Sequence, residues 1–130
     1  MTNAPSPSPA TTSDRIVLTL PGNSRLRSVA SLVLGGIGSR IDLPYEKVDE
    51  LQLAVLTVLG ASDLESATIE VDIQDTRVLV TVGPLPSGTS AAPGLHTVLE
   101  RLADGAESSM RETDGVSAEW VTLTLARPPA

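Results

Sequence analysis

Few residues of this chain have the type and spacing that catalytic chemistry requires. The chain has no cysteine, which excludes disulfides, thiolate zinc sites and a cysteine nucleophile, and its one histidine excludes His-rich metal sites. That histidine, His96, has no evident Ser-Asp partner set, so we expect a surface or partly buried residue and not a catalytic one. The run Gly35-Gly36-Ile37-Gly38 is not followed by Gly-Lys-Ser/Thr, and we expect it to weaken the end of a helix and not to bind phosphate.

Composition narrows the possible partners. The 130 residues suit a single domain, and a hydrophobic content of 41% is enough for a buried core. The net charge of -7 and the pI near 4.5 disfavour nucleic acid, because nucleic-acid binding depends on Lys and Arg that neutralise phosphates. The sequence contains no apolar run of membrane-spanning length and no signal-peptide pattern, so we expect no membrane association and a cytoplasmic location.

The first half of the chain predicts a tail, a strand and two helices. Residues 1–13 are rich in Pro, Ser and Thr, and we expect a disordered tail followed by a single domain over residues 14–127. Alternating apolar residues predict a strand over 16–20, and Pro21-Gly22-Asn23-Ser24 then breaks it and offers a helix cap. Apolar residues at helical spacing predict helices over 24–39 and 44–60.

The second half predicts an antiparallel sheet with one more helix. Clean alternation predicts two strands, 68–73 and 77–82, joined by a turn, and residues 83–93 read as a loop because they contain three prolines and two glycines. A helix follows over 95–102, then two strands joined by a turn at Asp114-Gly115. Trp120 should lie with Thr122 and Thr124 on one face of the last strand, as a packing residue or as an interface anchor. The predicted fold class is α+β, a two-layer sandwich of a mostly antiparallel sheet covered on one face by three helices.

Three segments carry a family resemblance. The segment Asp49-Glu50-Leu51-Gln52-Leu53-Ala54-Val55 resembles the lead-in of the first ATP-binding helix of the bacterial anti-sigma-factor/serine-kinase family, which has the GHKL (Bergerat, histidine-kinase-like ATPase) fold. The segment 21–37 resembles the family's opening strand and helix, and Gly94-Leu95 with Leu102-Ala103-Asp104 resembles its closing helix. The resemblance covers about residues 14–126 and implies the same fold.

The same resemblance implies that the ATP chemistry is lost. The family places a catalytic Glu where this chain has Thr57 and a magnesium-binding Asn where it has Ala61. Neither residue can act as a general base or supply a Mg²⁺ ligand of that kind. The Asp-x-Gly-x-Gly turn after the hairpin is replaced by a segment that begins at Gly83, and of the second glycine motif only Gly94 is clearly left. We therefore expect a vestigial nucleotide site at these four positions and no catalytic residue. Asp63 would face away from that site, because an offset of two residues turns a helical side chain by about 200°.

The expected function is regulation by binding. The resemblance implies a homodimer and, as partner, a sigma factor or a STAS-type anti-sigma antagonist, with Arg25 and Arg27 at the position where the family has a partner-contacting arginine. Solvated helix-end arginines are at least as good an interpretation of these two residues. We expect no metal and neither ATP nor Mg²⁺ as cofactor. A divergent ATP-binding serine kinase and a purely structural domain stay open as alternatives.

Overall fold

The computed structural model describes residues 14–23, 25–61 and 63–128 of the chain. In order, these residues form β1 (Asp14–Pro21), α1 (Leu26–Arg40), α2 (Tyr45–Leu59), β2 (Ser66–Ile73), β3 (Arg77–Leu85), the short 3-10 helix η1 (Thr89–Ala91), α3 (Leu95–Leu102), β4 (Gly105–Thr113) and β5 (Val116–Ala126). The tail predicted for residues 1–13 and the cap offered by Ser24 lie outside the described residues.

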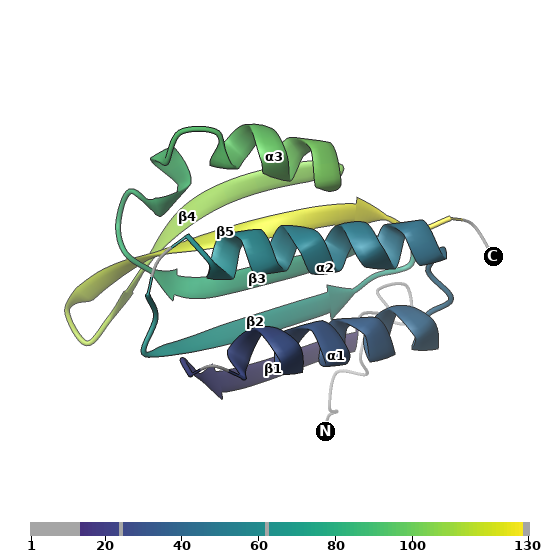
Figure 1. Cartoon of the computed structure of the whole chain (residues 1–130), viewed down its shortest axis with the longest axis horizontal. Helices are drawn as coiled ribbons and strands as arrows, with labels where there is room; N and C mark the ends of the chain where they lie inside the picture. The colour runs from purple at the N-terminus through teal and green to yellow at the C-terminus, as the bar shows by residue number, and fades with distance from the viewer. Residues whose placement is uncertain (1–13, 24, 62, 129–130) are drawn as a thin grey trace, which may run out of the picture.

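The strands form one antiparallel sheet in the order β1-β2-β3-β5-β4. Figure 1 shows the three helices on one face of this sheet, with α1 above β1 and β2, α2 near the centre, and α3 toward β4 and β5. Among the described residues, no element covers the other face, which we call the open face. The predicted α+β architecture with helices on one face is therefore confirmed.

Alternation in the strands separates the two faces. On the helix-covered face, Ile69 and Val71 of β2 oppose Val82 and Val80 of β3, and all four side chains are buried. The β4–β5 hairpin turns at Asp114 and Gly115, which have positive φ angles of 53° and 78°. An Asp-Gly pair suits such a two-residue turn, because the turn needs φ above zero at both positions.

The glycines of α1 lie in its last two turns, close to the helix end near residue 39 that the sequence predicts. The helix continues to Arg40, and a Cβ on Gly35 or Gly38 would press against Gln52 or Val48 of α2. The missing side chains therefore let α1 and α2 approach closely. Gln52 strengthens this contact, since its Nε2 donates a hydrogen bond of 2.7 Å to the backbone oxygen of Ser31.

The hydrophobic core lies between the helix layer and the sheet. Its largest fully buried side chains come from every helix except η1 and from the three central strands. They include Leu34, Leu51, Val55, Val58, Ile69, Val71, Val78, Val80, Leu85, Leu99, Leu123 and Leu125. The edge strands contribute less: Ile16 and Leu20 of β1 are only partly buried against this core.

Candidate functional site

Thr57 and Ala61 lie at the carboxyl end of α2. The hydroxyl of Thr57 donates a 2.7 Å hydrogen bond to the backbone oxygen of Leu53, one turn earlier in the same helix. Ala61 follows the last helical residue by two positions and is exposed. The Thr57 hydroxyl uses its proton within its own helix and is no general base, and the methyl group of Ala61 offers no polar atom.

Gly83 is not in a loop, which corrects the sequence-based expectation. It lies within β3, because β3 extends to Leu85, and a Cβ at Gly83 would collide with the ring of Trp120. Trp120 lies on the open face, as its alternation with buried Val121 and Glu119 requires. Gly83 therefore serves as the floor under an aromatic side chain, on the opposite side of the sheet from α2 and Thr57.

Gly94 stands at the first turn of α3. Its φ of 81° is in the left-handed region that favours glycine, and the space where a Cβ would stand is open. Gly94 therefore turns the chain into α3. The structure places Thr57 and Ala61 at the carboxyl end of α2, Gly94 directly before α3, and Gly83 in β3, where its missing side chain faces Trp120.

The segment between β3 and α3 is held against the sheet by Glu119 of β5. This carboxylate is 4% exposed, and it accepts hydrogen bonds from the backbone N–H of Ser90, at 3.2 Å, and from the Ser90 hydroxyl. Thr89 is also buried, and its hydroxyl donates to the backbone oxygen of Pro86 at 2.5 Å. Residues 86–94 thus form a short connection whose middle is fixed by a buried acid.

The environment of Glu119 keeps it ionised. Burial alone raises the pKa of this carboxyl group, but hydrogen bonds from the side chain and backbone of Ser90, from Ser108 and from the backbone of Thr89 outweigh burial. The pKa of Glu119 therefore lies below its ordinary value of 4.5. At neutral pH this carboxylate is therefore charged and is hydrogen-bonded to the connection that precedes α3.

Helix α3, which follows this connection, packs against α2 and the core. Leu95 and Leu99 of α3 are buried in the core cluster that includes Val55 and Leu59 of α2, and the two helices contact each other. Apolar side chains therefore fill the space between α2 and α3.

Arg25 and Arg27 are both exposed, but they point to different sides of α1. Arg25 lines a small groove with Leu20 and Val29, on the β1 side. Arg27 lies toward the carboxyl end of α2: its Nη1 is 3.2 Å from the position that a Cβ on Gly60 would occupy. The structure does not bring these two arginines together as a pair.

A network of charged side chains crosses the open face, and the sequence analysis missed it. Arg111 of β4 donates two hydrogen bonds to Glu70 of β2, of 2.9 and 3.1 Å, and its guanidinium carbon lies 4.2 Å from the centre of the Trp120 ring. Arg15 of β1 is 3.2 Å from the same carboxylate. Hydrogen bonding and charge from Arg111, and charge from Arg15, lower the pKa of Glu70 against the opposing effect of burial. Trp120 is thus clamped between Arg111 and Gly83.

Other residues of chemical interest are isolated. His96 is exposed on α3, where its Nε2 lies 3.3 Å from Glu100. Within residues 14–23, 25–61 and 63–128, no group of three or more His, Asp or Glu residues is placed to hold a metal ion. Within the same residues, no helix has both the length and the apolarity needed to cross a membrane.

Compared with known proteins, the chain matches no family model and no curated protein sequence.

Proposed function

We propose that this protein is a regulatory binding domain of the anti-sigma-factor type with a histidine-kinase-like (GHKL) fold, acting in bacterial transcription regulation through protein–protein contacts. The element order and the one-sided helix layer support this proposal, because the resemblance of residues 14–126 implies that arrangement. A sigma factor or a STAS-type antagonist is the proposed partner. Such a partner would be met in the cytoplasm.

The observation that carries the proposal is the attachment of the β3–α3 connection to Glu119. In the family, the nucleotide lies beside the first ATP-binding helix and under the segment that follows the hairpin. Here that segment is short, and its Thr89 and Ser90 are fixed by a buried carboxylate. Opening it would break hydrogen bonds to a charged group, each of which contributes about 1.5–3 kcal/mol. This arrangement favours a rigid surface over a nucleotide lid.

The side chains of α2 support the same conclusion. Thr57 uses its hydroxyl on the oxygen of Leu53, and Ala61 has no polar group to offer. A base in the correct position contributes on the order of 10² to 10⁴ in rate, so its loss alone removes most catalytic power. A domain that keeps the fold but has lost these groups can still bind a partner protein.

A titration with nucleotide tests the proposal directly. Millimolar Mg²⁺-ATP at a micromolar site would add about 4 kcal/mol to the free energy of unfolding and raise the melting temperature by several degrees. We expect no shift. A shift of that size, removed by replacing residues of α2, would contradict the proposal and favour a divergent ATP-binding kinase.

A titration with candidate partners tests the binding half. Sigma factors and STAS proteins from the same genome are titrated calorimetrically against the wild type and against Arg25→Glu and Arg27→Glu separately, since the two arginines lie on different sides of α1. We expect one variant to lose at least about tenfold in affinity while its circular dichroism spectrum is unchanged. If no sigma factor or STAS protein binds the wild type, the anti-sigma proposal fails.

A further inference from the structure

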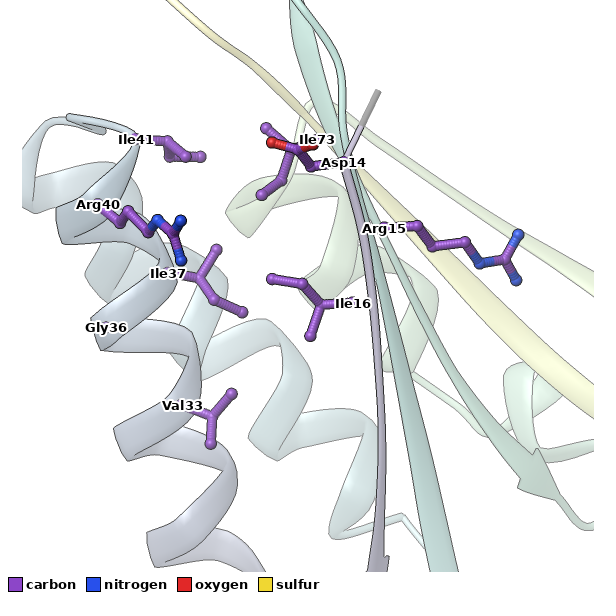
Figure 2. Close-up of a pocket in the computed structure, with 9 residues that line it drawn as sticks. All are labelled: Asp14, Arg15, Ile16, Val33, Gly36, Ile37, Arg40, Ile41 and Ile73. Atoms are coloured by element: carbon purple, nitrogen blue, oxygen red, sulfur yellow. The ribbon is translucent and has the colours of Figure 1, made fainter. Parts of the chain in front are cut away.

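A cleft separates α1 from the edge strand β1. It has a volume of about 500 Å³, and its walls include Ile16, Val33, Ile37 and Ile73. Figure 2 shows Ile16 and Ile37 pointing toward each other across it, whereas Arg15 points away to the open face. Pockets that bind ligands commonly have volumes of about 300–1,000 Å³ and apolar walls. The cleft is therefore large enough for the side chains of a bound molecule.

Gly36 lines this cleft without contributing a side chain to it. It is exposed on α1, and no atom lies within 4 Å of the position that its Cβ would occupy. Gly35 and Gly38 are explained by the contact with α2, but Gly36 has no such packing reason. Glycine inside a helix costs about 1 kcal/mol relative to alanine, so its effect here is to leave the cleft open at a cost in stability.

The strand beside the cleft offers backbone hydrogen bonds. β1 pairs with β2 over eight positions in regular register, and among the described residues nothing pairs with its other edge. Edge strands are usually protected by charges, prolines or bulges, because their free N–H and C=O groups attract another strand. The central residues of β1, from Ile16 to Leu20, contain none of these protections.

The charges near the cleft select for an acidic group. Arg40 lines the cleft and has no salt bridge with any described residue, and Figure 2 shows its side chain extending from α1 toward the gap. Arg127 lies at the same end, where its guanidinium donates to the backbone oxygens of Gln74 and Ile41. Asp14 is the opposing charge. Arg15 also lines the cleft but pairs with Glu70, so Arg40 is the lining cation that has no ion pair among the described residues.

We propose that the cleft binds an extended peptide segment of a partner protein, which adds to β1 as a sixth strand. Every second side chain of the peptide, aliphatic in type, enters the cleft over Gly36, and an acidic side chain meets Arg40. Addition of a strand beside a helix-lined groove uses backbone hydrogen bonds for affinity and side-chain pockets for specificity. This inference does not depend on the anti-sigma proposal, since any partner with such a segment would satisfy it.

The test uses the full chain and a displayed library of random peptides of eight residues, the length of β1. Selected sequences should alternate aliphatic with polar residues and include Asp or Glu. Their synthetic copies are then measured by fluorescence anisotropy against the wild type, Gly36→Leu, Gly36→Ala and Arg40→Glu. Gly36→Leu fills the cleft and should weaken binding at least about 30-fold, whereas Gly36→Ala should change it little. Arg40→Glu should weaken peptides that carry an acidic residue.

A methylation scan of the peptide backbone distinguishes strand addition from other binding modes. Only every second N–H of an added strand faces the neighbouring strand. Methylation of these nitrogens should abolish binding, whereas methylation of the nitrogens between them should be tolerated. A scan without this two-residue period, or binding that Gly36→Leu leaves unchanged, would overturn the proposal. Failure to select any peptide would overturn it as well. Occupation of the cleft by a second copy of the chain, seen as a dimer that Gly36→Leu breaks, would also overturn it. Unchanged circular dichroism and melting temperature of Gly36→Leu show that the variant is folded.

Discussion

The two sides of the helix layer are built differently. On the α3 side, Leu95 and Leu99 fill the space beneath the helix, and Glu119 ties down the preceding connection. On the α1 side, Ile16 and Val33 are only partly buried, and a cleft of about 500 Å³ remains between helix and edge strand. Both sides belong to one sheet and one core. Their difference in packing therefore comes from particular residues, such as Glu119 on the α3 side and Gly36 on the α1 side.

This difference separates the two proposals. The proposed GHKL fold would place a nucleotide on the α3 side, where Glu119 holds the connection before α3, whereas the α1 side has a free strand edge among the described residues.

The largest expected effect comes from packing on the α3 side. Leu99→Ala removes a 2% exposed side chain from the core and should lower the free energy of unfolding by about 2–4 kcal/mol. Ile16→Ala, on the α1 side, should lower the free energy of unfolding by about half as much, because its side chain already borders the cleft. Urea unfolding of the two variants measures the difference. Equal losses would mean that the two sides are packed alike.

A smaller effect is expected at Glu119, and it depends on pH. Glu119→Gln should cost about 1–3 kcal/mol at neutral pH, because the charged acceptor of Ser90 is lost. The folded pKa of Glu119 is lowered, so its stabilising contribution is present above the ordinary value of 4.5 and is lost as the pH falls through the lower folded value. The wild type should thus lose stability below pH 4.5 more steeply than the variant. Parallel pH profiles in thermal unfolding would contradict the role of Glu119.

The glycines of α1 allow a matched test on the α1 side. Gly36→Ala should raise the free energy of unfolding by about 0.5–1 kcal/mol, because the added Cβ meets open space and favours the helix. Gly38→Ala should lower it instead, because the same group presses against Val48 of α2. Chemical denaturation resolves opposite signs easily. Destabilisation by both substitutions would show that Gly36 has a packing role.

The smallest expected effect distinguishes the two arginines at the start of α1. Arg27→Glu places a negative charge near the carboxyl end of α2 but also in the first turn of α1, so the two effects oppose each other and the net cost should be at most about 0.5 kcal/mol. Arg25→Glu places the same charge at the amino end of α1 and should be neutral or slightly stabilising. Melting curves at low and high salt measure both, and the difference should shrink as salt is added.

Much of the fold could be predicted from local patterns. Alternation over 68–73 and 77–82 predicted β2 and β3, and Asp114-Gly115 predicted the last turn. Such signals work because side-chain period and turn conformation depend on near neighbours in the chain. The end of β3 was misplaced, since Gly83 and Pro84 resemble loop residues although Gly83 pairs with Thr68 in the sheet.

The site was less predictable. The chemical types of Thr57 and Ala61 could be judged from the sequence alone, but the position of Gly83 beneath Trp120 could not. The contact between Glu70 and Arg111 joins residues 41 positions apart on strands that are not neighbours. The sequence does show that Glu70 and Arg111 are charged residues on strands with alternating polar positions. Which charges contact each other, however, depends on strand order and register.

The sequence by itself determined the period of each element, the face that each strand buries and the residue types at positions 57 and 61. Each of these follows from residue types at short spacing. Tertiary structure alone decided that Gly38 packs against α2 while Gly36 faces open space, and that Glu119 holds Ser90. These outcomes depend on which surfaces the folded chain brings together, and residues with the same local pattern can meet a helix, a strand or solvent.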